Sequence, residues 1–186
     1  MTRVLQRFTV SGDPCPPGVL DAPALKIPET DEGMRMLIPH IRPAVEAMHH
    51  GCTIRGVALA LPQIGVSLAA VVYNPTGRRG DESILVNPDW DPILESIEPA
   101  TLENEEACLS VQEGSRPVVV ARHASIYGFW TAVTKWWSGK PTFAPGMTGQ
   151  FHGYQARVWQ HACDHIDGKI FGGCRVAAHF SGGCRV

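Results

Sequence analysis

Gln160-His161-Ala162-Cys163-Asp164-His165 is the stretch that decides how this 186-residue chain folds. Two histidines four positions apart on a helix lie one turn from each other, so both imidazoles can bind one metal ion. This is the spacing of the H-E-x-x-H motif of metal hydrolases, in which the glutamate after the first histidine acts as general base. Ala162 stands at that position, so the sequence predicts a hydrolase-type metal site without its usual proton carrier.

The helix around this stretch, predicted over 153–166, has a separate apolar side. At about 100° per residue, that side consists of Ala156, Trp159, Cys163 and Ile166. Cys163 is therefore predicted to be a core residue and not a metal ligand. Asp164 and Arg157 flank the histidine face, where we expect them to form a charge pair that orients the histidines from outside the ligand shell.

The bulk composition fits one globular domain. The length suits a single hydrophobic core, and the net charge of -2 gives no electrostatic footprint for nucleic acid or an anionic membrane. No apolar run is long enough to span a membrane, and the first residues lack the features of a secretory signal. We therefore expect a cytoplasmic protein, with a mitochondrion or plastid as the alternative. In such a compartment the six cysteines are expected to be free thiols or metal ligands.

The N-terminal part predicts an extended arm followed by a helix. Five prolines within residues 1–30 favour an arm without regular secondary structure. The helix that follows can be capped by Thr30 or Asp31. Pro39 and Pro43 fall inside this helix and predict a late start or a kink. Its apolar stripe is formed by Met34, Ile38, Ile41, Val45 and Met48.

The middle of the chain is rich in strand-forming residues. Strands are predicted over 67–74 and 83–87, joined by a hairpin loop at 75–81, and again within 117–130. Residues 88–105 are expected to be acidic and irregular, and residues 131–150 to form a hairpin or long loop beside the site. The 172–186 segment, which contains Gly-Gly-Cys-Arg-Val twice, is expected to be a flexible tail after a single domain over 1–171.

A third metal ligand must come from elsewhere in the chain, because three protein ligands plus water is the common arrangement at a catalytic metal. Cys108, in the segment Glu106-Ala107-Cys108-Leu109-Ser110, is the best candidate. Gln63 is a polar amide in an apolar segment. It is therefore either a satisfied structural group or a contact to a ligand.

Three segments occur in the order 56–63, 106–110 and 160–165, the first being Gly56-Val57-Ala58-Leu59-Ala60-Leu61-Pro62-Gln63. Together they resemble the signature of the peptide deformylase family, which reads G-x-G-L-A-A-P-Q, E-G-C-L-S and Q-H-E-x-D-H. The resemblance covers roughly residues 3–171. It implies an α+β fold with antiparallel β-sheets around a central metal-binding helix, plus an N-terminal helix.

That family removes the formyl group from N-formylmethionine at the start of new polypeptides. The resemblance implies N-formylated nascent peptides as substrates, with the ribosome as a further candidate partner. It also implies one divalent metal ion, Fe(II) in the family with Zn or Ni as alternatives, held by Cys108, His161 and His165. Gln63 and the backbone N–H of Leu109 correspond to the groups that stabilise the developing oxyanion.

Four positions depart from the family signature. Ala162 replaces the general base, and Ala58, Leu61 and Ala107 each replace a smaller residue. Loss of a general base typically costs about 10²–10⁴-fold in rate, so we expect very low or absent deformylase activity. The predicted substrate groove, which the larger side chains would crowd, is lined by Gly56, Val57, Ala58, Leu61 and Glu106.

Two functions of different classes remain open at this point. One is a deformylase whose base is missing, by drift or by engineering, and the other is a non-catalytic paralogue that binds N-terminal peptides. Four changes around one site favour natural divergence over a single engineered substitution. A purely structural metal domain is disfavoured because three donors leave a coordination position open. A zincin-type protease would not explain the first two segments.

Overall fold

The computed structural model describes residues 15–50, 57–93, 101–106, 108, 110 and 118–169. Gly56, Ala107, Leu109 and the 172–186 segment lie outside the described residues. The helices are α1 (Asp31–His50), the short 3-10 helix η1 (Leu61–Ile64) and α2 (Gly153–Ile166). The strands are β1 (Ala58–Ala60), β2 (Ala70–Tyr73), β3 (Ser83–Pro92), β4 (Thr101–Glu106), β5 (Val118–His123), β6 (Ser125–Thr134) and β7 (Thr142–His152).

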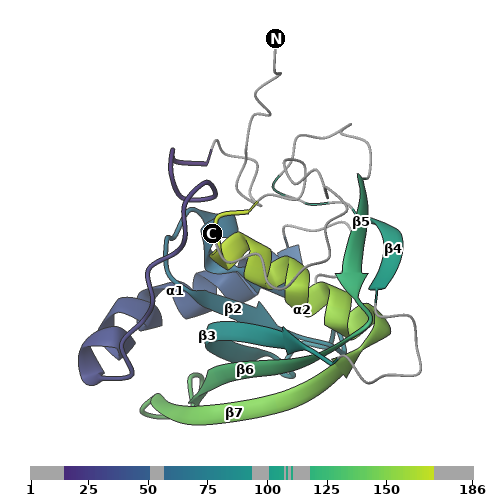
Figure 1. Ribbon diagram of the computed structural model, residues 1–186. Helices are drawn as coiled ribbons and strands as arrows, with labels where there is room; N and C mark the ends of the chain where they lie inside the picture. Colours follow the sequence, from purple (N-terminus) through teal and green to yellow (C-terminus); the bar gives the residue numbers. More distant parts are fainter. Residues whose placement is uncertain are drawn as a thin grey trace.

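The strands form two antiparallel sheets (Figure 1). The larger sheet has five strands in the order β1-β2-β3-β6-β7, and the smaller one pairs β4 with β5. The predicted hairpin loop at 75–81 is confirmed, because β2 and β3 on either side of it pair antiparallel with Tyr73 opposite Ser83. The smaller sheet stands beside α2 (Figure 1).

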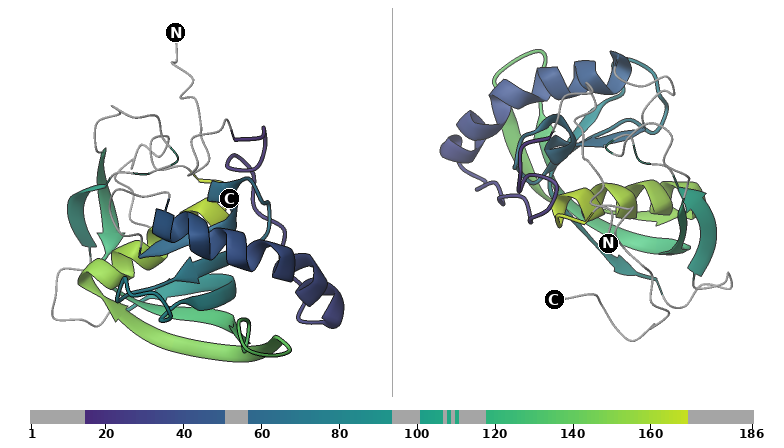
Figure 2. Two further views of the ribbon diagram at one scale, coloured as in Figure 1. Left: turned by 180° about the vertical axis from the view of Figure 1, so that it is seen from behind. Right: turned by 90° about the horizontal axis from the view of Figure 1, so that it is seen from above.

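The central part of the larger sheet is covered on both faces. Successive side chains of a strand point to opposite faces, so Ala70 and Val72 of β2 pack in the cluster that contains α1. Val71 and Tyr73 pack in the cluster that contains α2. The two helices therefore lie on opposite faces of the sheet, as the two views of Figure 2 show.

Helix α1 begins at Asp31, so the late start, one of the two predicted effects of Pro39 and Pro43, does not occur. Thr30 is the residue that caps it, since its hydroxyl accepts a hydrogen bond from the Gly33 N–H at 3.4 Å. The predicted apolar stripe holds except at Ile38, which is 44% exposed, while the neighbouring Leu37 is fully buried. These two positions are about 100° apart on the helix, and Leu37 is the one that packs against the sheet.

Helix α2 has the predicted apolar side, and all four of its members are buried in one cluster. The described part of the proline-rich arm is extended and crosses the end of this helix. Its Ala24 N–H donates to the carbonyl of Ile166 at 2.8 Å. Leu25 also exchanges backbone hydrogen bonds with Ser67 and Ala69. The arm therefore connects the C-terminal end of α2 to the segment before β2.

One segment differs from its prediction, and a second has the predicted hairpin. Residues 88–105 are not irregular throughout, because β3 continues to Pro92 and β4 begins at Thr101. Residues 131–150 do form a hairpin, built from β6 and β7. Its aromatic residues Trp136 and Phe143 pack against the α1 cluster, on the face of the sheet opposite α2. No helix in the described part of the chain is both long enough and apolar enough to cross a membrane.

Candidate metal centre

The three predicted ligands meet at one point. Cys108 Sγ lies 3.3 Å from His165 Nε2, and His165 Nε2 lies 3.2 Å from His161 Nε2. All three ligand atoms are within 4.8 Å of one another. With metal–nitrogen bonds of about 2.0–2.1 Å and a metal–sulfur bond of about 2.3 Å, neighbouring ligands of a tetrahedral ion lie about 3.3–3.6 Å apart. The donor set and its spacing therefore fit one small divalent ion.

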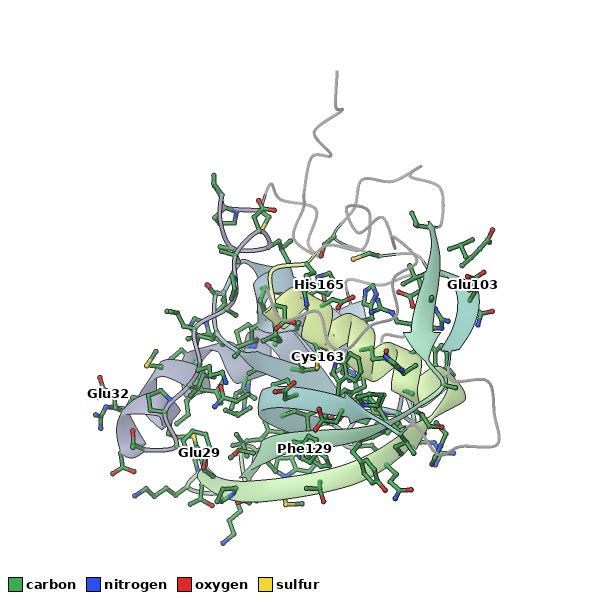
Figure 3. The ribbon with its side chains drawn as sticks, viewed as in Figure 1. Glu29, Glu32, Glu103, Phe129, Cys163 and His165 are labelled. Carbon is green, nitrogen blue, oxygen red and sulfur yellow. The ribbon has the colours of Figure 1, made fainter. Side chains whose placement is uncertain are left out.

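The two faces of α2 separate the ligands from the core. The imidazole rings of His161 and His165 are almost perpendicular, at 85°, and their Nε2 atoms lie 3.2 Å apart. Cys163 packs among apolar side chains, and burial raises the pKa of its thiol. Figure 3 shows Cys163 on the sheet side of the helix and His165 on the opposite side. The prediction that Cys163 is a core residue is confirmed.

Hydrogen bonds and charges between the ligands shift the pKa values of Cys108 and His161. Burial raises the pKa of the Cys108 thiol, but hydrogen bonds with His161 and His165 outweigh burial and bring this pKa to about 5. Burial lowers the pKa of His161, but its bonds with Cys108 and Glu106 raise that pKa to about 9. Cys108 is thus a thiolate at neutral pH, the form that binds metal ions, and a metal ion must displace the proton from His161.

Glu106, which was predicted to line the substrate groove, makes a hydrogen bond with the ligand His161. Its carboxylate is buried and accepts a hydrogen bond from His161 Nδ1 at 3.0 Å, two from Arg122 at 3.0 Å, and one from Arg157. Burial raises the pKa of Glu106, but the bonds with His161 and Arg122 outweigh burial and lower the pKa to about 2. The carboxylate therefore stays ionised and leaves His161 Nε2 directed at the metal position.

The predicted pair of Arg157 with Asp164 is wrong in its partners. Asp164 accepts a 2.6 Å hydrogen bond from Arg122, while Arg157 binds Glu106 and the carbonyl of Val120. Burial lowers the pKa of Arg122, but its bonds to Glu106 and the charge of Asp164 outweigh burial and raise the pKa above its ordinary range. Arg122, which sequence reasoning missed, is the residue that joins the two carboxylates beside the ligands.

Gln160 has a structural role that sequence reasoning also missed. Its side-chain oxygen accepts from the His123 N–H at 3.0 Å, and its Nε2 donates to the His123 carbonyl at 2.9 Å. It therefore extends the hydrogen bonding of β5 onto α2 and fixes the helix against the smaller sheet. Gln160 is only 2% exposed, a burial that the sequence did not show.

Comparison with known proteins identifies the family of this chain. The family model described as polypeptide deformylase matches residues 6–174. The peptide deformylase of Acidothermus cellulolyticus is 34% identical over 160 residues, which cover 86% of this chain and 73% of that protein. This chain belongs to the polypeptide deformylase family.

Solved deformylase structures confirm the α+β fold. The peptide deformylase from Legionella pneumophila superimposes with a TM-score of 0.61 at 28% identity, covering 90% of this chain and 83% of that one. The peptide deformylase from Thermotoga maritima gives a TM-score of 0.60 at 28% identity, covering 90% of this chain and 95% of that one. Relatives of this kind therefore share both the elements and their arrangement with the present chain.

The deformylase segment 56–63 is described from Val57 onward. Gln63 is buried, its Oε1 accepts from the Ala60 N–H at 2.9 Å, and its Nε2 lies 3.4 Å from Ser110 Oγ. The amide is thus both a satisfied structural group and directed towards the segment that carries Cys108. Leu61 is 1% exposed and packs in the α1 cluster, and its place in the substrate groove stays a prediction.

Ala58 and Ala162 are the other described positions that depart from the family signature, and both pack in or against the α2 cluster. Ala58 and Val57 are half-buried, and Ala58 packs against the α2 cluster. Ala162 is a member of that same cluster together with Ala60 and is 5% exposed. Position 162, which the resemblance predicts to correspond to the general base, thus carries a methyl group packed in the core.

Glu106→Gln is expected to weaken Zn²⁺ binding about 10–100-fold, the usual cost of losing a partner behind a metal-bound histidine. The amide keeps the size of the side chain but removes the charge that balances Arg122 and orients His161. The measurement is a competition titration against a chromophoric chelator. Glu105→Gln, which neutralises the exposed neighbour on the same strand, is the matched control and should bind Zn²⁺ like the unsubstituted chain. Equal affinities for both variants would contradict the assigned role of Glu106.

Proposed function

We propose that this chain is a metal-dependent peptide deformylase-like hydrolase of N-formylmethionyl peptides whose turnover is very low because Ala162 occupies the place of the general base. The observation that carries the proposal is the pairing of a complete ligand set with an apolar residue next to the first histidine. Cys108, His161 and His165 are close enough to share one ion. Ala162, one residue after His161, is packed in the core.

One divalent ion, Fe(II) with Zn or Ni as alternatives, is proposed to bind the three ligands. When bound, such an ion polarises a carbonyl group and acidifies a water molecule. Two features of the chain favour the binding of this ion. The Cys108 thiol is already deprotonated at neutral pH, and His161 is held by Glu106 with its Nε2 turned to the other ligands.

Gln63 is proposed to bind the formyl oxygen together with the backbone N–H of Leu109. Two preorganised donors are the usual means of stabilising charge that develops on a carbonyl oxygen. The hydrogen bond from the Ala60 N–H to Gln63 Oε1 fixes the amide, so its Nε2 can only point away from β1. Ser110, which lies 3.4 Å from this nitrogen, belongs to the segment of Cys108.

Neither carboxylate beside the ligands can take over the proton transfer. Glu106 has a pKa of about 2, far below the value near the working pH that a general base needs. Asp164 is engaged by Arg122 at 2.6 Å. Both carboxylates thus belong to the support of the site, and within the described part of the chain they do not substitute for the missing glutamate.

The ligand proposed for this site is an N-formylated nascent peptide. Such peptides arise at ribosomes that initiate with formylmethionine, so the proposed place of action is the bacterial-type cytoplasm or an organelle with that translation system. The ribosome itself is a candidate partner within the same proposal.

Release of formate from formyl-Met-Ala-Ser by the Zn²⁺- or Fe²⁺-loaded protein tests the proposal. We expect the peptide to bind the metal-loaded protein, while formate appears about 10²–10⁴-fold more slowly than with a general base in place. Metal content is measured on the same sample, so that an empty site is not taken for a slow one. Turnover of about 1–10³ s⁻¹, the ordinary range of enzymes, would refute the claim of a disabled site. Failure of the loaded protein to bind the peptide would refute the assignment of the ligand.

A further inference from the structure

Two loops meet at one end of the larger sheet. Loop 74–82 joins β2 to β3, and loop 135–141 joins β6 to β7. The start of β3 pairs with the end of β6, so the register brings the two loops side by side. A Cβ placed on Gly80 of the first loop would lie 3.8 Å from the ring of Trp137 in the second, which is an ordinary contact distance. We refer to these two segments together as the tip loops.

The tip loops are rich in exposed cations, namely Arg78, Arg79, Lys135 and Lys140. Arg79 pairs with Glu46 of α1 at 3.2 Å. Among the described residues, no acidic side chain forms an ion pair with any of the other three cations. The net charge of -2 is an average over the whole chain and does not show this local group of positive charges.

The two acids of the tip loops leave this positive excess in place. Glu82 is buried, where it forms a hydrogen bond with His49 of α1 and accepts another from the Gly80 N–H at 2.8 Å. Asp81 is exposed and accepts a 2.6 Å hydrogen bond from the Thr76 hydroxyl. Three cations without an ion pair therefore stand against one exposed carboxylate, and the surface of the tip loops favours an anionic partner.

Trp137 adds an aromatic surface to these charges. The residue is 56% exposed. Its ring stacks on that of Trp136, with centroids 5.1 Å apart and an angle of 26° between the planes. Trp136 in turn packs against the α1 cluster, so the exposed ring is held in place before any partner binds. An aromatic ring among cations is the arrangement on which the bases of a single-stranded nucleic acid stack while Lys and Arg follow its phosphates.

The backbone of Lys135 points to the same use. Its φ of 54° lies in the left-handed region, which glycine adopts with less strain. The Ser138 N–H donates to the Lys135 carbonyl at 3.3 Å and closes the turn. Residues in this region persist where the surrounding structure holds them, and they are common at binding sites. The presence of a lysine at such a position favours a role for its charge.

We propose that the tip loops bind a single strand of RNA, with Trp137 stacking on a base and phosphates contacting Arg78, Lys135 and Lys140. A polyanion is the fitting partner because each phosphate that pairs with a cation releases bound counterions. RNA presents unpaired bases in its loops, bulges and ends. An anionic membrane fits less well, because Trp137 is the only large apolar side chain that the tip loops expose.

The inference does not depend on the proposed function, since the tip loops contain no residue of the metal centre. Formate release and metal content test that function separately. The protein can therefore bind RNA and be inert towards formylated peptides, or the reverse.

Fluorescence anisotropy of a labelled oligoadenylate with the full chain tests the proposal. The strand has about 12 nucleotides, within the range of about 4–16 for one binding surface. We expect a Kd of about 10⁻⁶–10⁻⁴ M at physiological salt. Each phosphate contact to a single strand contributes a salt slope of about -0.7, so three contacts predict about a 20-fold loss of affinity between about 50 and 200 mM salt.

Variants separate charge from stacking. Lys135→Gln with Lys140→Gln leaves one of the three contacts, so the same rise in salt should weaken binding only about 2–3-fold. Trp137→Ala should weaken binding at least about fivefold, and Trp137→Phe, which keeps an aromatic ring, should restore most of the affinity. Lys26→Gln with Arg35→Gln removes two exposed cations outside the tip loops and is the matched control. It should bind like the unsubstituted chain, and a thermal melt shows that each variant is folded.

Four results would overturn the inference. A Kd weaker than about 10⁻⁴ M for the unsubstituted chain would show that it does not bind RNA in the expected range. Equal losses in the lysine variant and in the control would place the RNA on another surface. Unchanged affinity of Trp137→Ala would exclude base stacking. Sedimentation with vesicles of phosphatidylserine and phosphatidylcholine is measured in parallel, and vesicle binding that exceeds RNA binding and is lost in the lysine variant would assign the tip loops to a membrane.

Discussion

Ala162→Glu is expected to raise kcat/KM for formylated peptides by at least about 100-fold, the lower limit for gaining a positioned general base. Ala162 follows His161 directly, and its methyl group is 5% exposed at the border between the α2 cluster and the metal face. A longer side chain from this position can leave the apolar cluster and reach towards the ligands. The measurement is formate release from formyl-Met-Ala-Ser under identical metal loading.

The matched control for this gain is Ala162→Gln. It has the same length and polarity but cannot accept a proton at neutral pH, so it should not exceed the activity of the unsubstituted chain. Both variants place a polar group in an apolar cluster and should lower the free energy of unfolding by about 1–3 kcal/mol. A thermal melt of each variant therefore accompanies the assay. If Ala162→Glu is folded, loaded with metal and still inert, the chain is a binding protein and the missing base is not what limits it.

Cys108→Ala is expected to abolish stoichiometric metal binding. The remaining donors, His161 and His165, cannot hold a catalytic ion without a third protein ligand. The loss of Zn²⁺ affinity should exceed the 10–100-fold range that applies to groups behind the ligands. Zn²⁺ at 100 times its Kd should stabilise the unsubstituted chain by about 2.7 kcal/mol, seen as a higher Tm, and should leave the Tm of Cys108→Ala unchanged.

Cys163→Ala is the control that the chain itself provides. This second cysteine is two residues from His161 and His165 in sequence but packs in the α2 cluster, so its removal should lower stability and preserve one bound metal ion. The comparison distinguishes a ligand from a nearby core thiol. Equal metal content in the two alanine variants would show that Cys108 is not the third ligand.

Helix α2 shows how much the sequence can reveal about this site. Its ligands repeat every four residues and its core residues every three to four, so one wheel assigns both faces and separates Cys163 from the histidines. The structure places each of these residues as that wheel predicts. Local periodicity carries this information because every position of a helix is fixed relative to the others.

The charge network around the ligands could not be predicted from the same helix wheel. Arg122 lies 16 residues from Glu106 and 42 residues from Asp164 in sequence, and it comes from a strand. A single helix wheel offers Asp164 only the partner on its own helix, which led to the wrong pair with Arg157. Which charges meet is decided by the packing of the smaller sheet on α2, and no local pattern in the sequence encodes that packing.

The errors at 88–105 and at Ile38 have related causes. Acidic residues in β4 suggested a loop, yet Glu103 and Glu105 belong to a strand that pairs with β5. That pairing is a long-range property that overrides the weak local preference. Ile38 and Leu37 are both large apolar residues, so their side chains do not predict which of them is buried. Only the position of the sheet determines that Leu37 is buried and Ile38 is exposed.

Helix α2 follows all the described strands along the chain, and this order has a consequence during protein synthesis. Cys108 and His165 are 57 residues apart, so a ribosome working at about 5–20 residues per second needs about 3–11 s to pass from one to the other. For that interval the Cys108 thiol is present without the histidines that keep it deprotonated. The nascent chain therefore has no competent metal site until α2 has been made and has closed this long loop, and metal acquisition becomes a late step that reports completion of the fold.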